Sequence, residues 1–210
     1  MKYFWDPLQR VQRLRRADAA REHDQGTDRL PPGQALTLKF PVLTYGSTPN
    51  VRPDDWTFEV WGLVEEPKTW TWDEFLAIGA KEQVCDIHCV TRWSKFDTLW
   101  KGIPFKAVYE QLKPKPGADY VMLHSYGGYT TNMRVDEMLD DSVMFAYEYE
   151  GKPLERDHGG PMRALVPRLY FWKSAKWVRG LEFMNTNRPG FWEMYGYHIH
   201  GDYRLEQRFS

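Results

Sequence analysis

The sequence lacks any run of about 18 apolar residues, has only two cysteines, and shows no marked excess of charge of either sign. We therefore expect no transmembrane helix. Two cysteines in a chain without a recognisable export signal are not expected to stabilise the fold through disulfides. Lys and Arg number 28 against 29 Asp and Glu, and this formal net charge of -1 gives no indication of nucleic-acid binding.

An export signal is also missing near the start of the chain. The pair Arg15-Arg16 is not followed by an apolar stretch, so neither a secretory nor a twin-arginine signal can be read there. With Met1 at the start, we expect a cytoplasmic protein. A cap at Asp6 and a narrow apolar stripe predict a helix that reaches about Arg21.

Aromatic residues, by contrast, are abundant. Ten Trp, twelve Tyr and eleven Phe can fill a large core or line a pocket, and the hydrophobic content of 42% is enough for a core without disulfides. A Pro-Pro-Gly connector at residues 24–33 predicts an N-terminal helical extension and connector at residues 1–35. One main domain should then cover residues 36–210.

Within that domain the signals for strands and short helices interleave without an even repeat. Helices are predicted after the capping-box sequence at Thr71 and from Pro104, whose apolar face includes Phe105 and Val108. Strands are predicted at residues 56–61, 81–89, 119–124, 142–147, 163–166 and 177–183. This pattern favours an α+β fold with a mixed sheet. Long loops at residues 39–53, 158–161, 170–176 and 185–201 are candidate site segments.

Both cysteines lie in one short stretch with a histidine, and several chemistries compete there. Residues 85 and 89 would lie about 13 Å apart on a strand, which makes a disulfide between them improbable. Zinc wants four ligands, whereas Cys85, His88 and Cys89 offer three. Both thiols can also be inert and buried, which suits Cys85. Because His88, Arg92 and Lys95 are close in sequence to Cys89, its thiolate is favoured, and a thiolate can bind a soft or redox-active metal.

Two basic segments downstream predict an anion site. Arg163 follows the turn His158-Gly159-Gly160-Pro161, and Lys173-Ser174-Ala175-Lys176 precedes a predicted strand. Glycines let backbone approach an anion, Arg grips phosphate with two donors, and Lys adds a point charge. Spacing alone does not show that these segments meet each other or Cys89.

Two blocks together resemble a known family. The segment from Cys89 to Ser94, followed by Trp100-Lys101-Gly102-Ile103-Pro104, resembles the molybdenum-ligating segment of the sulfite oxidase family's molybdopterin-binding domain. The region from Pro153 to Trp177 is similar to that family's second signature. The form of the cysteine segment found here resembles the bacterial branch of the family that includes the catalytic subunit of the periplasmic methionine sulfoxide reductase.

The resemblance implies one sulfite-oxidase-type domain with a single pterin bound to molybdenum, and Cys89 as the protein's thiolate ligand to the metal. His158 and Arg163 would contact the pterin or its phosphate, and Ser174, Ala175 and Lys176 would cradle the phosphate. Further implied cofactor contacts are Thr44, Tyr45 and Ser125. Arg92 would attract an oxyanion or a polar S=O group, and Tyr195 would be the active-site tyrosine.

The sequence also departs from that family. Arg92 stands alone where animal and plant members carry a run of arginines, and Thr91 replaces an acidic residue of the bacterial relative. No haem or immunoglobulin-like domain fits into 210 residues, so a separate electron-transfer partner is expected. The oligomeric state stays open.

Three functions follow. The first is a molybdenum-dependent oxidoreductase that moves an oxygen atom or two electrons on a small molecule such as a sulfoxide, sulfite or another oxyanion. The second is a molybdopterin carrier or partner-assembly module without turnover, and the third is a zinc or thiol-redox protein.

Overall fold

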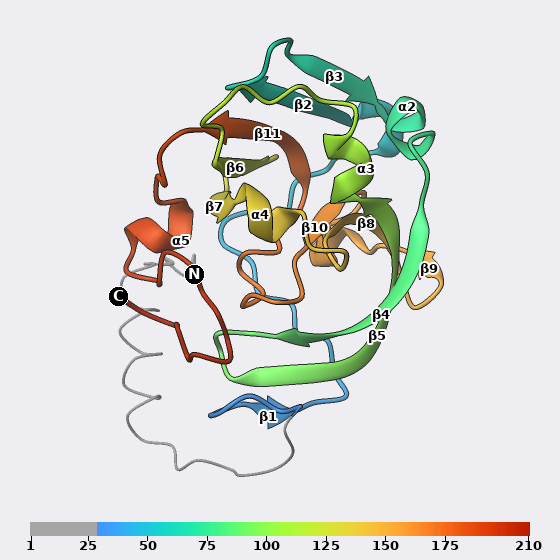
Figure 1. Ribbon diagram of the computed structural model, residues 1–210. Coiled ribbons are helices and arrows are strands. Elements are labelled where there is room, and N and C mark those ends of the chain that lie inside the picture. Colours follow the sequence, from blue (N-terminus) through green and yellow to red (C-terminus); the bar gives the residue numbers. More distant parts are fainter. Residues whose placement is uncertain (1–28) are drawn as a thin grey trace.

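The computed structural model describes residues 29–210, which form two sheets packed on a shared core (Figure 1). One sheet has the strand order β1(Ala35–Leu36), β5(Trp93–Pro104), β8(Met144–Tyr149), β10(Arg163–Leu165), with β4(Lys81–His88) paired to β5 and β9(Lys152–Pro153) paired to β8. The other sheet has the order β3(Lys68–Thr71), β2(Thr57–Gly62), β11(Val178–Met184), β6(Tyr120–Ser125), β7(Thr130–Arg134). The predicted N-terminal helix lies outside the described residues.

Both sheets are mixed, as the sequence predicted for an α+β fold. Strand β5 is parallel to β1 and antiparallel to β4 and β8, and strand β11 is parallel to β2 and antiparallel to β6. Figure 1 shows β4 and β5 as a long curved hairpin that runs from α2(Trp72–Leu76) to β1. The hairpin carries both cysteines toward the end of the domain that lies away from α2.

The helices are short and pack at the ends of strands. They are α2, α3(Phe105–Tyr109), α4(Val135–Met138) and α5(Phe191–Met194), with 3-10 turns η1(Pro53–Asp55) and η2(Arg156–His158). The capping box predicted before α2 is present: the Glu74 carboxylate accepts from the Thr71 amide at 2.8 Å. Helix α3 begins one residue after the predicted Pro104 and ends at Tyr109.

The main core lies between the two sheets. Phe58 on β2 and Phe145 on β8 have ring centroids 4.8 Å apart, and Phe75 of α2 and Phe105 of α3 close the same cluster. Burying each such ring is worth about 1.5–3 kcal/mol. Two smaller aromatic clusters lie around Trp100 and around Cys89. The abundant aromatic residues therefore fill the main core and also form separate clusters, one of them around Cys89.

The predicted strands at residues 56–61, 81–89, 119–124, 142–147, 163–166 and 177–183 correspond to β2, β4, β6, β8, β10 and β11, with ends displaced by up to two residues. Strands β1, β3, β5, β7 and β9 were not predicted. The division at residue 36 stays a prediction, although the connector contacts the domain: the buried Gln34 side chain donates to the Cys89 carbonyl at 3.1 Å.

Candidate active site

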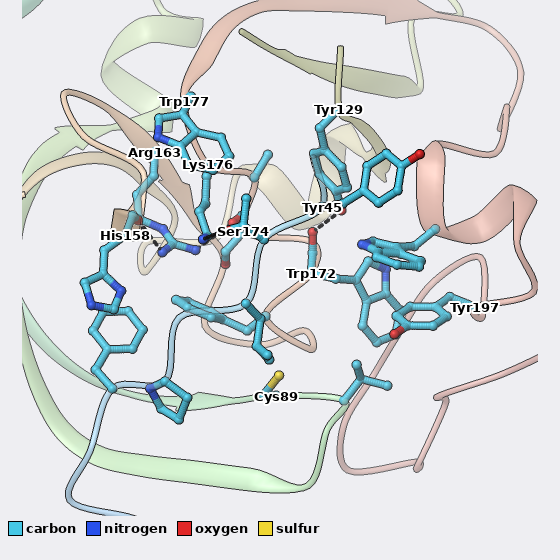
Figure 2. Close-up of a pocket in the computed structure, with 18 of the residues that line it drawn as sticks. Tyr45, Cys89, Tyr129, His158, Arg163, Trp172, Ser174, Lys176, Trp177 and Tyr197 are labelled. Atoms are coloured by element: carbon cyan, nitrogen blue, oxygen red, sulfur yellow. Dashed lines mark hydrogen bonds between the residues drawn. The ribbon is translucent and has the colours of Figure 1, made fainter. Parts of the chain in front are cut away.

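A cleft with about 820 Å³ of open volume brings together segments that are far apart in the sequence. Figure 2 shows the Cys89 sulfur pointing into it, with basic side chains on one side and aromatic side chains on the other. Of the residues predicted as site residues, those lining the cleft are Thr44, Tyr45, Cys89, His158, Arg163, Ser174, Ala175 and Lys176.

Cys89 lies in a tight turn directly after β4. Its amide donates to the Trp93 carbonyl at 2.8 Å, and the Arg92 amide donates back to the Cys89 carbonyl at 2.9 Å. Arg92 occupies the left-handed region with φ of 71°, which closes the turn. The Thr91 hydroxyl donates to the Cys89 sulfur at 3.1 Å, and such a bond favours the thiolate.

The basic neighbours of Cys89 in sequence form hydrogen bonds to other residues. Arg92 donates to the Gly33 carbonyl at 3.1 Å and Lys95 to the Leu38 carbonyl at 2.9 Å, and neither lines the cleft. His88 bonds Ser94 at 2.8 Å through Nδ1, and burial lowers its pKa to about 4, so it is neutral at pH 7. The favouring of the Cys89 thiolate by these three neighbours therefore stays a prediction.

Neither a disulfide nor a zinc site is present among the described residues. No disulfide joins Cys85 to Cys89, and the Cys85 sulfur lies 3.9 Å from the Thr98 hydroxyl instead. Burial raises the pKa of Cys85 to about 12, which keeps it an inert thiol. Residues 29–210 contain no group of three or more His, Cys, Asp or Glu side chains able to hold a metal ion. A metal at Cys89 therefore requires ligands from outside residues 29–210.

Arg163 is the central cation of the basic side. It is 1% exposed and donates to the carbonyls of His158 at 2.8 Å and Ser174 at 2.7 Å, while its guanidinium lies 4.1 Å from the Phe171 ring centroid. No carboxylate within residues 29–210 pairs with it. Burial lowers its pKa to about 9, which leaves it charged at neutral pH. A buried cation with only neutral partners is costly unless an anion joins it.

Lys176 and His158 complete this side. The Lys176 ammonium donates to the Asp157 carbonyl at 2.7 Å and to the Thr44 hydroxyl at 2.9 Å, and the His158 ring stacks on Phe40 at 3.9 Å. Gly159, with φ of 111°, allows the close approach, because a Cβ there would meet the Cβ of Lys176 at 3.0 Å. The two basic segments that the sequence could not place together are therefore adjacent.

These residues fit an anionic, planar organic cofactor that carries a soft metal. The described residues that line the cleft include cations but no Asp or Glu. Arg163 and Lys176 suit a phosphate, the aromatic rings suit a flat heterocycle, and Cys89 offers one soft ligand. The resemblance of the sequence blocks and the charge of the cleft thus agree on the type of ligand.

The other side of the cleft is aromatic. Tyr197 lies edge-on to Trp172 at 4.8 Å and stacks on Trp192 at 5.0 Å, and Tyr45 lies 6.3 Å from Trp192. The Tyr129 hydroxyl donates to the Trp172 carbonyl at 2.7 Å (Figure 2). Sequence reasoning missed Trp172, Trp192 and Tyr197, although they lie in two of the long loops that it identified.

Three predicted site residues lie outside the cleft lining, and their roles stay predictions. Tyr195 packs on Phe191 at 5.1 Å, Arg92 donates to the Gly33 carbonyl, and Ser125 lines a separate depression together with Tyr129. The Ser125 hydroxyl is buried and has no hydrogen-bond partner within the described chain.

Comparisons with known proteins give concordant results. The family model described as "Oxidoreductase molybdopterin binding domain" matches residues 45–192. The uncharacterized oxidoreductase YuiH of Bacillus subtilis is 43% identical over 191 residues, which cover 90% of this chain and 96% of that protein. The putative protein-methionine-sulfoxide reductase subunit YedZ1 of Azospira oryzae is 30% identical over 81% of this chain and 66% of that protein.

More distant relatives are longer. The protein-methionine-sulfoxide reductase catalytic subunit MsrP of Ralstonia nicotianae is 27% identical, with 80% of this chain matching 54% of that protein. The sulfane dehydrogenase SoxCD of Paracoccus pantotrophus has a similar fold, with a TM-score of 0.60 at 20% identity over 66% of this chain and 40% of that one. The chain thus spans nearly all of the Bacillus protein but only part of these others.

Proposed function

This chain belongs to the oxidoreductase molybdopterin-binding domain family and is a molybdopterin-dependent oxidoreductase of the sulfite oxidase type, and from that premise we propose which residues hold the cofactor and which substrate the cleft takes. The single observation that carries the proposal is the division of the cleft around Cys89: cations without acids on one side, aromatic rings on the other.

The basic side binds the cofactor. Arg163, whose charge is buried, and Lys176, which Thr44 orients, bind its phosphate, and Phe40 and His158 pack beside the heterocycle. Cys89 supplies one thiolate to molybdenum, and the Thr91 hydroxyl stabilises the negative charge on that sulfur. The resemblance to the sulfite oxidase family supports a single pterin, which supplies the metal's other sulfur ligands. When bound, this cofactor supplies two-electron redox chemistry at an oxygen-accepting metal.

The aromatic side receives the substrate, and we assign to it a neutral organic S-oxide or N-oxide. The described residues on that side carry no cation, and Arg92 faces Gly33 instead. A sulfite-sized anion would lose its hydration there without gaining a charged partner, which is costly. A polarisable neutral molecule loses less and gains contacts with Trp172, Trp192 and Tyr197. The family's anionic substrates are therefore disfavoured in this chain.

Reduction of such an oxide consumes two electrons and two protons and releases water. The residues of the aromatic side exclude bulk water and hold the S=O or N–O group toward the Cys89 end of the cleft. The electrons would come from a separate electron-transfer partner, as expected from the sequence.

No helix within residues 29–210 has the length and apolar character needed to span a bilayer.

The test compares a neutral substrate with a charged analogue and with a neutral analogue of similar size. Cofactor-loaded enzyme would be assayed with a reduced viologen dye on methyl phenyl sulfoxide, on its para-carboxylate analogue, and on its para-methoxy analogue as the control for size. We expect the carboxylate to lower kcat/KM at least about thirtyfold, as an unpaired charge in an apolar site implies, while the methoxy group has a small effect. Equal turnover of the carboxylate, or faster oxidation of sulfite, would refute the neutral-substrate assignment. Inertness toward every compound would favour a carrier.

A further inference from the structure

A fully buried ion pair lies behind the aromatic side of the cleft. The Lys173 ammonium is 2.6 Å from Glu193 Oε1, and the two side chains are 0% and 1% exposed. Lys173 belongs to the Lys-Ser-Ala-Lys segment, yet it does not line the cleft and is unavailable to a phosphate. Buried ion pairs are weak evidence for stability, because desolvation offsets their attraction. The contacts of this pair indicate another role.

Lys173 joins three segments of the chain. Its ammonium donates to the carbonyl and the side-chain oxygen of Asn132 on β7, at 2.9 and 3.0 Å, and to the Ile199 carbonyl at 2.7 Å. These bonds connect the cleft loop at residues 170–176 with strand β7 and with the C-terminal loop. The lysine therefore fixes the position of Glu193 from the side away from the cleft.

Glu193, on α5, accepts hydrogen bonds from Lys173, Thr131 and Trp172 through a single oxygen, Oε1. The bonds from the Trp172 indole N–H and from the Thr131 hydroxyl are both 2.9 Å long. Oε2 is buried without a hydrogen-bond partner within residues 29–210. The carboxylate is thus directed at the single polar atom of the Trp172 ring.

Trp172 is the member of the aromatic side that this carboxylate holds. Its backbone carbonyl is bonded by Tyr129, and its ring is so close to Gly201 that a Cβ there would lie 2.7 Å away. Tyr197 packs edge-on against the same ring at 4.8 Å. A shift of the indole would therefore move Tyr197 as well.

We propose that Glu193 is a positioning residue, whose carboxylate, held by Lys173, fixes the Trp172 indole and through it the aromatic side of the cleft that receives the substrate. The substrate part of this inference rests on the proposed function. The bond between carboxylate and indole is independent of it. A pair that only stabilised the fold would change the stability of the protein and leave substrate affinity unaltered.

Two double variants separate these roles. Lys173→Met with Glu193→Gln removes both charges but keeps an oxygen acceptor for the indole, whereas Lys173→Met with Glu193→Leu removes the acceptor too. Both lack the ion pair, so a difference between them reports the bond to Trp172. We expect the first to keep KM for methyl phenyl sulfoxide within about twofold of wild type and the second to raise KM about fivefold to tenfold, the range of one hydrogen bond. The turnover number and pterin content should be unchanged in both.

A second readout needs no activity. In cofactor-free protein labelled with ¹⁵N-tryptophan, the Trp172 indole N–H is identified as the cross-peak lost in Trp172→Phe. Its hydrogen exchange should be slow in wild type and in the glutamine variant, and at least about tenfold faster in the leucine variant, because the protecting bond is gone. A carboxylate variant away from the cleft, Glu182→Gln on the second sheet, is the matched control and should leave this peak unchanged.

Identical KM and identical indole exchange in the two double variants would overturn the proposal, since packing alone would then hold Trp172. If the leucine variant does not fold, Trp172→Phe replaces it: a smaller aromatic ring remains and the N–H donor is lost, so an unchanged KM would likewise overturn the proposal. If wild-type enzyme turns over no neutral oxide, the proposed substrate is wrong, and the exchange experiment still decides the positioning role separately.

Discussion

Arg163→Met should prevent the cofactor from being retained while leaving the fold intact. In wild type the guanidinium is buried, donates to the His158 and Ser174 carbonyls, and has no acidic partner among the described residues. Replacing an unpaired buried cation by an apolar side chain of similar length relieves desolvation, although two carbonyls lose their donors. These effects oppose each other, so we expect the stability of the cofactor-free protein to change by less than about 2 kcal/mol.

The effect on the cofactor should be much larger. Two unit charges about 4 Å apart near a protein surface attract by about 4 kcal/mol, which corresponds to roughly a thousandfold in affinity. The assay measures molybdenum by mass spectrometry and pterin by fluorescence after oxidative release, both on protein that has passed through gel filtration. Because a ligand that binds only the folded state stabilises it, the difference in Tm between loaded and cofactor-free wild type should also disappear in the variant.

The control is Arg168→Met, which removes an exposed arginine that pairs with Asp140 and does not line the cleft. It should retain the full cofactor content. If Arg163→Met were purified with as much molybdopterin as wild type, the assignment of the basic side of the cleft to the cofactor would be refuted.

Three further predictions concern the surrounding structure. Because burial lowers the pKa of His88 from 6.5 to about 4, the unfolded chain binds more protons than the folded chain between these pH values, and the free energy of unfolding should decrease by up to about 3 kcal/mol as pH falls from 6.5 to 4. Urea titrations of His88→Gln should show that this part of the pH dependence is lost. An unchanged dependence of the unfolding free energy on pH would contradict the prediction. Gly102→Ala would place a Cβ against the Phe145 carbonyl of the neighbouring strand. Calorimetry should show a Tm that is lower by about 2–4 °C for each kcal/mol of strain. An unchanged Tm would show that β5 and β8 are less closely packed at this position than the structure has them. Cys85→Ser should leave molybdenum and pterin content as in wild type, and their loss would show that the thiol is not merely structural.

The sequence predicted well what depends on short motifs. The capping box before α2, the strand that ends at the cysteine turn, and the pairing of Arg163 with Lys176 at one site were all anticipated from local residues or from the resemblance. The α+β class followed from irregular interleaving of strand and helix signals. Each of these features depends on residue types whose local chemistry allows few alternatives.

Strands β5 and β7 were missed for identifiable reasons. In β5 alternate residues are buried, but two of them are Ser94 and Thr98, so the apolar alternation is hidden. In β7 the buried Thr131 and Asn132 bond to Glu193 and Lys173, so the polar network behind the cleft removes the strand's hydrophobic signal. The burial of a polar side chain cannot be predicted from its own segment when its hydrogen-bond partners lie far away in the sequence.

Which residues of a loop line the cleft is not read from the sequence. The tyrosine of the loop after α5 that lines the cleft is Tyr197, because the turn after α5 places it there, and the role expected for Tyr195 stays a prediction. Arg92 closes the turn with its positive φ and its side chain bonds Gly33, and its expected role at the substrate likewise stays a prediction. A difference of two residues or one backbone angle decides such placements.

The central claim is that Cys89 is the protein's ligand to a molybdenum held by a pterin. X-ray absorption at the molybdenum edge tests it most directly on protein from cells supplied with molybdate. We predict stoichiometric molybdenum in wild type, and in Cys89→Ser a metal site with one sulfur fewer and with the pterin still bound. Stoichiometric zinc without molybdenum in wild type, or the same number of sulfur ligands in Cys89→Ser, would contradict the account.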